Sequence, residues 1–270
     1  HSHPELLKTL HEQSSKLAIT SRAFYTEPFS TFLEKLSKVS GFESVLTMNT
    51  GAEAVETAIK AARRWGYFSK GIPEDKAEII VANGNFHGRT TTIVSFSSDA
   101  SYKDGFGPFT PGFNSAEYCG SCDCQSIDSC LSIESFEKKI NKNTCAILVE
   151  PIQGEAGIRV PTDGWLKQLR ALCTSRNILL ILDEIQSGLG RTGKLFAYEH
   201  ENIKPDGLIL GKALGGALLP ISAFLSSKEI MNHFNPGSHG STFGGNPLAS
   251  KIAIKAVSYT HLTLPTKCWV

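Results

Sequence analysis

Short apolar runs that do not alternate with polar residues recur along the chain and limit the folds open to it. Stretches whose apolar residues repeat at about 3.6 positions lie between these runs. The apolar runs are 78–82, 145–149, 178–182, 208–210 and 221–225. A strand has such a continuous apolar sequence when it is buried on both faces, as in a parallel sheet covered by helices. The sequence therefore predicts an α/β fold, with a mostly parallel central sheet flanked by helices.

Three segments carry the helical period. They span 50–65, 163–176 and 246–257. In the first, Thr50 and Glu53 have the spacing of a capping box, which favours a helix start there. The segment 258–270 drops the helical pattern for β-branched residues and a proline, and it resembles a translated sequencing adapter. We interpret 258–270 as a non-native tail; a native terminal strand is the alternative.

The charge balance excludes some classes of partner. The chain has 270 residues, with 27 Lys and Arg against 26 Asp and Glu, and a formal net charge of +1. Such a balance predicts neither nucleic-acid binding nor attraction to an anionic membrane. No apolar run approaches the roughly 20 residues that a membrane-spanning helix needs.

Polar and glycine residues follow the predicted strands. These segments are 83–89, 150–155, 183–186 and 211–212, and a further one, 49–52, precedes the first predicted helix. The carboxyl ends of parallel strands meet at one edge of a sheet, which is where open α/β sheets bind ligands. The sequence thus predicts one edge with a lysine, an aspartate, an arginine, two glutamates, an aromatic ring and a helix N-terminus.

This set of groups suits one cofactor. The helix start at Gly51 and Ala52 offers free N–H groups to a phosphate. At a strand end Lys212 would be partly desolvated, which lowers an amine pKa and favours a Schiff base. Asp183 can hold a pyridine nitrogen protonated, and Phe86 can stack on a planar ring. Together these groups predict pyridoxal 5′-phosphate, although each residue also has an ordinary structural explanation as surface charge, helix cap or core.

Two other patterns suggest competing functions. Cys119, Cys122, Cys124 and Cys130 crowd into one segment and are weak candidates for zinc or an iron–sulfur cluster, against a surface loop of free thiols. We expect no metal. The glycines at 188, 190 and 193 fit G-x-G-x-x-G and raise an NAD-dependent oxidoreductase as a remote alternative. Four residues separate them from the strand and no helical pattern follows, so the context disfavours a dinucleotide site.

Several motifs together resemble a known family. They occupy 48–54, 85–90, 104–109, 149–157, 182–186, 211–214 and 240–247. In this order they are similar to those of the class III (ω-)aminotransferases, which belong to fold-type I of the pyridoxal-phosphate enzymes. Within that class the chain most resembles the ornithine aminotransferases. The resemblance implies that 1–257 is a cofactor-binding large domain, incomplete at both ends and without the C-terminal small domain.

The resemblance also implies roles around the cofactor ring. Lys212 would bind the cofactor as a Schiff base and then transfer the proton as general base and acid. Asp183 would pair with the pyridine nitrogen and Gln186 with the ring hydroxyl. Ile185 and Phe86 would lie on the two faces of the ring.

Further implied roles concern the phosphate and the substrate. Gly51 and Ala52 would hold the phosphate, completed by Thr242 from the other subunit of a homodimer. His87 would belong to the cofactor site. The residues implied for the substrate are Arg89 for a carboxylate, Glu150, and Glu155 as a gate that pairs with a C-terminal arginine.

The implied reaction transfers the δ-amino group of ornithine to 2-oxoglutarate and gives glutamate 5-semialdehyde and glutamate. Acetylornithine and 4-aminobutyrate aminotransferases share most of the motifs and stay open as alternatives. The segment 195–200 favours the acetylornithine enzymes, whereas 64–67, 104–109 and 240–245 favour the ornithine enzymes. We expect the 270-residue chain alone to turn over ornithine poorly or not at all. Cytoplasm and mitochondrial matrix are both open as its compartment.

Overall fold

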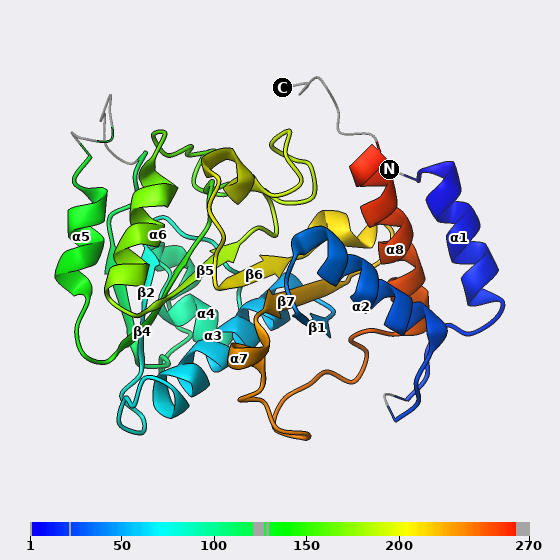
Figure 1. The fold of residues 1–270 in the computed structure, drawn as a ribbon, viewed down its shortest axis with the longest axis horizontal. Helices are drawn as coiled ribbons and strands as arrows, with labels where there is room; N and C mark the ends of the chain where they lie inside the picture. Colours follow the sequence, from blue (N-terminus) through cyan, green and yellow to red (C-terminus); the bar gives the residue numbers. More distant parts are fainter. Residues whose placement is uncertain (1, 22, 121–126, 128–129, 263–270) are drawn as a thin grey trace.

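The computed structural model describes residues 2–21, 23–120, 127 and 130–262. Its centre is a seven-stranded sheet in the order β1-β7-β6-β5-β4-β2-β3 (Figure 1). The strands are β1 (Ser44–Met48), β2 (Glu78–Ala82), β3 (Phe113–Ala116), β4 (Thr144–Val149), β5 (Leu179–Asp183), β6 (Gly207–Leu210) and β7 (Ser222–Ser226). The pairs from β3 to β6 are parallel, and β7 runs antiparallel to both β6 and β1. The predicted mostly parallel α/β sheet is confirmed.

Helices cover both faces of the sheet (Figure 1). They are α1 (Pro4–Ser14), α2 (Glu27–Ser40), α3 (Gly51–Phe68), α4 (Thr91–Ser95), α5 (Ser132–Lys139), α6 (Trp165–Ser175), α7 (Lys228–Met231) and α8 (Pro247–Leu262). Side chains of α2, α5, α6 and α8 share one buried cluster, and those of α3, α4 and α7 share another.

Neighbouring residues of one strand enter different clusters. Ile147 of β4 packs with α6, and Leu148 packs with α3. All residues of β4, β5, β6 and β7 are buried, which is why their sequences are apolar without alternation. Each fully buried Ile or Leu contributes roughly 1.5–3 kcal/mol to stability. The two half-exposed strands, β1 and β3, were not predicted because they lack this signal.

The predicted start of α3 is confirmed. The Thr50 side chain accepts a hydrogen bond from the Glu53 N–H at 3.2 Å, and the Glu53 carboxylate accepts from the Thr50 N–H at 2.7 Å. This reciprocal capping fixes the first turn directly after β1. The first turn therefore lies beside the carboxyl ends of the parallel strands.

The C-terminal helix differs from the prediction. The expected break after residue 257 is wrong, because α8 continues through Leu262. Intrinsic helix preferences differ by less than about 0.7 kcal/mol per residue, so β-branched residues alone do not end a helix that has already begun. Among the described residues, no helix is long and apolar enough to cross a membrane.

Candidate active site

A cavity of about 190 Å³ opens where β4, β5 and β6 end. It is lined by Gly51, Ala52, Phe86, His87, Gly88, Glu150, Asp183, Ile185, Gln186 and Lys212. All except Gly88 were singled out from the sequence as cofactor or substrate residues. They come from segments up to 161 positions apart, from residue 51 to residue 212, and the parallel sheet brings them together. Gly88 belongs to the motif 85–90, but nothing in the sequence alone marked it as a residue of the site.

Asp183 is the last residue of β5, and two donors fix its carboxylate. Its Oδ2 lies 2.7 Å from His87 Nδ1, and its Oδ1 accepts the Ile185 N–H at 3.0 Å. The His87 and Asp183 side chains are 0% and 3% exposed. Burial acts to lower the pKa of His87, but the hydrogen bond and the charge of Asp183 outweigh it, so the pKa is raised above its usual value. The contact with His87 therefore holds the Asp183 carboxylate in one orientation.

Glu150 follows β4 and places a second carboxyl group at the cavity. Its Oε2 accepts the Phe86 N–H at 3.0 Å, which holds the start of the 86–89 segment. Burial is the main cause that raises the pKa of Glu150 to about 7; His87 acts against it and the charge of Asp183 adds to it. Two carboxyl groups at one cavity therefore differ in their electrostatic surroundings, the arrangement expected at a functional site.

The first turn of α3 forms one wall of the cavity. The Ser222 hydroxyl donates to the Thr50 carbonyl at 2.6 Å and ties this turn to β7. A Cβ at Gly51 would lie 2.7 Å from Ile185 Cδ1, so only glycine allows Ile185 to lie this close to the helix start. The N–H groups at Gly51 and Ala52 belong to the first turn and have no partner within the helix. They suit an anion, which the positive end of the helix dipole also favours.

Lys212 lies at the rim, on a 3₁₀ turn two residues after β6. Its backbone φ of +40° lies in the left-handed region, which is unusual for a residue with a side chain and concentrates at functional positions. The side chain is exposed, so the predicted partial desolvation of Lys212 is wrong for this structure. The physical reason is that the strand stops before Lys212, and the cavity is open on that side.

Three predicted site residues do not line this cavity. Arg89 borders a neighbouring cavity, where its guanidinium lies 4.3 Å from the ring centre of Tyr102 and 5.7 Å from that of Phe86. Glu155 is exposed and accepts a hydrogen bond from Gln186 Nε2 at 3.0 Å. Arg89 and Glu155 are thus each one contact away from a lining residue.

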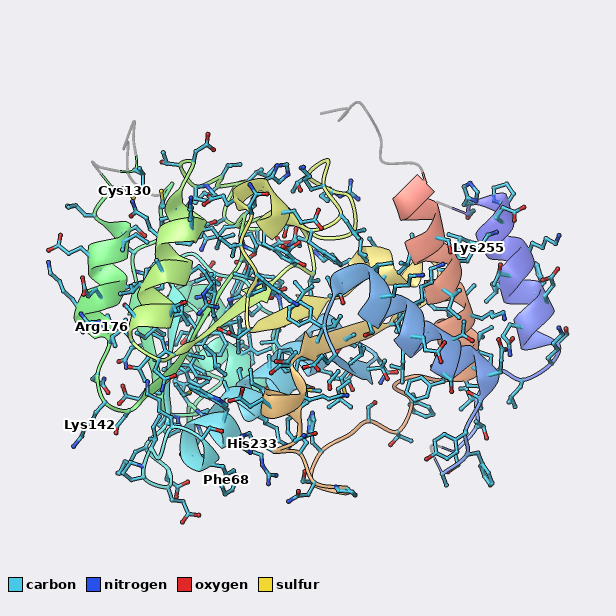
Figure 2. All side chains as sticks on the ribbon, viewed as in Figure 1. Phe68, Cys130, Lys142, Arg176, His233 and Lys255 are labelled. Carbon is cyan, nitrogen blue, oxygen red and sulfur yellow. The ribbon has the colours of Figure 1, made fainter. Side chains whose placement is uncertain are left out.

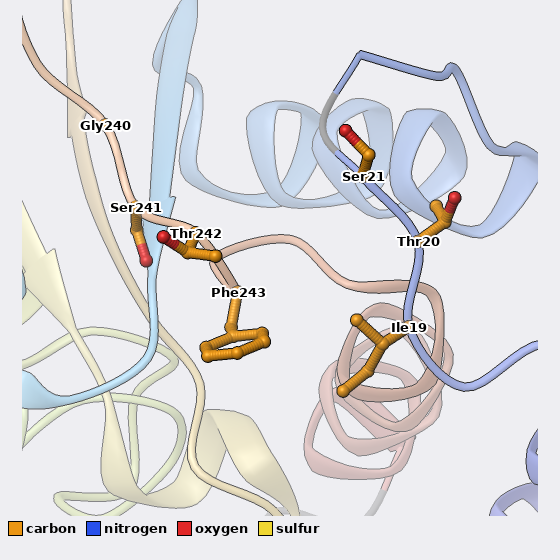
Figure 3. Close-up of a pocket in the computed structure, with 7 residues that line it drawn as sticks. All are labelled: Ile19, Thr20, Ser21, Gly240, Ser241, Thr242 and Phe243. Atoms are coloured by element: carbon orange, nitrogen blue, oxygen red, sulfur yellow. The ribbon is translucent and has the colours of Figure 1, made fainter.

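Thr242 lies in a separate cavity. That cavity is lined by Ile19, Thr20, Ser21, Gly240, Ser241, Thr242 and Phe243 (Figure 3). The Thr242 side chain is exposed. Within the described chain, Thr242 therefore does not reach the cavity of Lys212, and its assignment to another subunit stays a prediction.

A buried carboxyl that the sequence analysis missed lies beside the site. Glu184 is 1% exposed and accepts the N–H groups of Ala197 and Tyr198 at 2.7 and 2.9 Å. Burial is the main cause that raises its pKa to about 8, against these two hydrogen bonds. Glu184 thereby closes the glycine-rich loop 187–196. No α-helix starts in that loop, which consists of turns followed by a 3₁₀ helix, so it lacks the helix of a dinucleotide-binding motif.

The cysteine segment is only partly described. Cys119 and Cys130 are buried in the core cluster that contains α5 and α6. Cys122 and Cys124 lie outside the described residues. Among the residues that the structure describes, no group of three or more His, Cys, Asp or Glu side chains could hold a metal ion.

Comparisons with known proteins agree with this geometry. The profile of the family described as "Aminotransferase class-III" matches residues 1–261. The chain therefore belongs to the class-III aminotransferase family. Its fold is that of the fold-type I enzymes, and the cofactor of the family is pyridoxal 5′-phosphate.

Particular relatives are similar over nearly the whole chain. The ornithine aminotransferase of Brevibacillus brevis is 54% identical over 257 residues, which cover 95% of this chain and 61% of that protein. The crystal structure of the ornithine aminotransferase of Toxoplasma gondii superposes with a TM-score of 0.90 at 44% identity, over 97% of this chain and 59% of that one. The acetylornithine aminotransferase structure from Elizabethkingia anophelis gives 0.82 at 51% identity, over 97% and 61%. The chain thus spans about three fifths of the length of these relatives.

The residues of the cavity fit this cofactor. An amine, an oriented carboxylate, a helix start with free N–H groups, and the apolar faces of Phe86 and Ile185 meet at one place. His87 Nε2 is buried and has no hydrogen-bond partner among the described residues, so this nitrogen is free to interact with a further polar group. The chemistry of the donors matches the phosphate, the ring and the aldehyde of pyridoxal phosphate.

Proposed function

We propose that a protein containing this chain transfers the δ-amino group of ornithine to 2-oxoglutarate, giving glutamate 5-semialdehyde and glutamate. The observation that carries the proposal is the meeting of Lys212, Asp183, Phe86 and Gly51 around one cavity. The 54% identity to the Brevibacillus brevis enzyme supports ornithine as the amino donor.

When bound, pyridoxal phosphate supplies an aldehyde that takes up the amino group and a ring that withdraws electrons from the reacting carbon. The first-turn N–H groups of Gly51 and Ala52 would bind the phosphate. Phe86 and Ile185 would fix the plane of the ring between them. Asp183, oriented by His87, would keep a proton on the ring nitrogen.

Lys212 would carry the proton transfer. Its Nζ would hold the cofactor through the aldehyde. The same amine would act as the base and the acid that move a proton at the carbon bearing the amino group. A general base and acid of this kind contributes about 10²–10⁴-fold to a rate. Lys212 lines the cavity, as this role requires.

Arg89, Glu150 and Glu155 would face the substrate. The planar guanidinium of Arg89 suits a carboxylate, and its contact with the Tyr102 ring restricts its orientation. The hydrogen bond from Gln186 to Glu155 links the gate to a residue of the cofactor cavity. A carboxylate there favours a cationic amino donor, and a partner arginine would neutralise it for a dicarboxylate.

A half-reaction assay tests the proposal. The complete protein that contains this chain is loaded with pyridoxal phosphate, and the absorbance of the bound cofactor is followed after addition of ornithine, N-acetylornithine or 4-aminobutyrate. We expect ornithine to change the spectrum fastest. Borohydride reduction followed by peptide mass analysis should place the cofactor on Lys212. A complete protein that binds no cofactor, or one that reacts fastest with another donor, contradicts the proposal.

A second candidate is acetylornithine aminotransferase. The Elizabethkingia anophelis enzyme is more identical in sequence to this chain, at 51%, than the Toxoplasma gondii enzyme is, at 44%. The segment 195–200 also favours that branch. The same panel of donors separates the two activities, because acetylation removes the α-amino charge of ornithine.

The proposed enzyme is a homodimer in which Thr242 completes the phosphate site of the other subunit. The position of Thr242 in a cavity separate from Lys212 supports this arrangement. The compartment would be the cytoplasm or the mitochondrial matrix. The bacterial source of the curated relatives favours the cytoplasm.

A further inference from the structure

The loop 232–246, which joins α7 to α8 and carries Thr242, is attached to α3 at several points. Near its start, His233 lies 2.8 Å from Ser69 Oγ and stacks on Phe68 with ring centres 5.8 Å apart (Figure 2). Near its end, Ser241 Oγ accepts a hydrogen bond from Asn49 Nδ2 at 2.8 Å. Between these points His239 makes the contacts that fix the loop against the middle of α3.

The hydrogen bonds of His239 define its protonation. The Thr57 hydroxyl donates to the Glu53 carbonyl at 2.7 Å, so its oxygen accepts from His239 Nε2 at 2.8 Å. The ammonium of Lys60 donates to His239 Nδ1 at 2.9 Å. Both contacts are satisfied by a neutral imidazole whose proton is on Nε2. The ring also stacks on Phe234 at 5.2 Å, and burial together with Lys60 lowers its pKa.

The chain on the other side of Thr242 is held as well. Ser241 Oγ accepts the Gly244 N–H at 3.1 Å, which closes a turn around Thr242. A Cβ at Gly244 would collide with the Thr47 carbonyl of β1, and one at Gly245 with the Phe29 ring of α2. Thr242 itself is exposed between these two attachments. The backbone that carries the exposed Thr242 side chain is thus held on both sides.

We propose that His239 is a positioning residue that attaches the Thr242 loop to α3 and so sets where the Thr242 hydroxyl meets a phosphate bound by a second copy of the chain. The inference rests on the proposed function, because the phosphate is that of the cofactor. The same helix begins at Gly51 and Ala52, which bind a phosphate in their own subunit. Helix α3 would therefore contribute to two phosphate sites. Its first-turn N–H groups would bind the phosphate of its own subunit, and its contact with His239 would position Thr242 for the phosphate of the other subunit.

The test uses matched variants. His239→Phe keeps a ring to stack on Phe234 but removes both hydrogen bonds. His239→Gln keeps one donor and one acceptor. These variants are made alone and together with Thr242→Ala. The dissociation constant for pyridoxal phosphate is measured by absorbance titration, and the amide exchange of 240–245 is measured without cofactor.

Loss of one hydrogen bond to a charged phosphate weakens binding by about tenfold or more. We expect Thr242→Ala and His239→Phe each to raise the dissociation constant about tenfold, and the double variant to be no worse than Thr242→Ala alone. His239→Gln should restore most of the affinity. His239→Phe should also speed amide exchange in 240–245 without cofactor, which reports on the loop independently of binding.

Two results would overturn the inference. One is an effect of His239→Phe that persists in full in the Thr242→Ala background, which indicates a general structural role. The other is normal affinity in Thr242→Ala. All of these measurements use the complete protein that contains this chain, and its failure to bind pyridoxal phosphate when unmodified would instead overturn the proposed function, so the two failures are distinguishable.

Discussion

The cavity at the strand ends and the loop that carries Thr242 are built in different ways. The cavity collects residues from Gly51 to Lys212 within one chain, and the His87 and Asp183 side chains there are buried and paired. The loop presents an exposed threonine that has no place in that cavity. Both are attached to α3, one at its first turn and the other along its side.

This difference shows what a parallel sheet can and cannot assemble alone. Parallel strands end at a common edge, so residues that directly follow β4, β5 and β6 meet there whatever their separation in sequence. The segment 240–245 follows α7 and not one of these parallel strands. In the proposed enzyme, a residue placed there would contribute to a phosphate site through a second chain.

The largest effect is expected when the cavity loses its amine. Lys212→Ala should slow the half-reaction with ornithine about 10²–10⁴-fold, because the group that transfers the proton is removed. Stopped-flow absorbance of the complete protein, loaded with cofactor, measures this rate. The control is Lys142→Ala, which replaces an exposed lysine distant from the cavity and should leave the rate unchanged (Figure 2). Equal rates for the two variants would show that the cavity around Lys212 is not the reacting centre.

A pH-dependent effect is expected from the buried carboxyl of the cavity. Folding raises the pKa of Glu150 from its ordinary value of 4.5 to about 7, so the folded chain holds this proton more tightly than the unfolded chain does. That contribution to stability is present at low pH and is lost as the pH rises from 4.5 to 7. The free energy of unfolding of Glu150→Gln, taken relative to that of the unmodified chain, should therefore rise by about 2–3 kcal/mol as the pH rises from roughly 5 to 8.

Urea unfolding at both pH values measures the gain. Glu74→Gln replaces an exposed carboxyl outside the cavity and is the matched control. A difference between Glu150→Gln and the unmodified chain that is the same at both pH values would mean that Glu150 is not desolvated in the cavity.

The fit of the first turn predicts a smaller effect. Gly51→Ala places a Cβ against Ile185 Cδ1, the end of a flexible side chain that can shift, and should destabilise the chain by about 1 kcal/mol through overpacking. Ile185→Val removes that terminal carbon, so the cost of Gly51→Ala should be smaller in the Ile185→Val background. A double-mutant cycle by urea unfolding measures the coupling. Strict additivity would show that Ile185 does not define this wall of the cavity.

The smallest effect on stability is expected in the loop. Thr242→Ala changes an exposed side chain, so the free energy of unfolding should stay within about 0.5 kcal/mol. Its effect on cofactor affinity should appear only at chain concentrations where two chains associate. Analytical ultracentrifugation and cofactor titration over the same range test this. An effect of equal size in the monomer would show that Thr242 serves the phosphate site of its own chain. The cavity and the loop would then not differ in this respect.

Much of the sheet was predictable because burial leaves a direct signal in the sequence. The apolar runs that became β2, β4, β5, β6 and β7 were located to within a residue or so, since both faces of each strand are covered. The edge strands β1 and β3 are partly exposed and carry no such signal. The end of α8 was misplaced because local residue preferences are weak compared with packing.

The site was predictable in its membership but less so in its electrostatics. Asp183 and Lys212 were found because they follow buried strands, and the helix start at Gly51 because Thr50 and Glu53 have the spacing of a capping box. The exposure of Lys212, the burial of Glu184 and the anchoring role of His239 depend on neighbours distant in sequence. No local pattern encodes those contacts.

The sequence by itself determined the class of fold, the chemical groups at the strand ends and the family, because hydrophobic periodicity and residue order are local properties. Only the tertiary structure decided that His87 orients Asp183, that Glu150 is buried enough to raise its pKa, and that Thr242 lies outside the cavity of its own chain. The physical reason is that burial, charge coupling and reach depend on which distant residues the folded chain brings into contact.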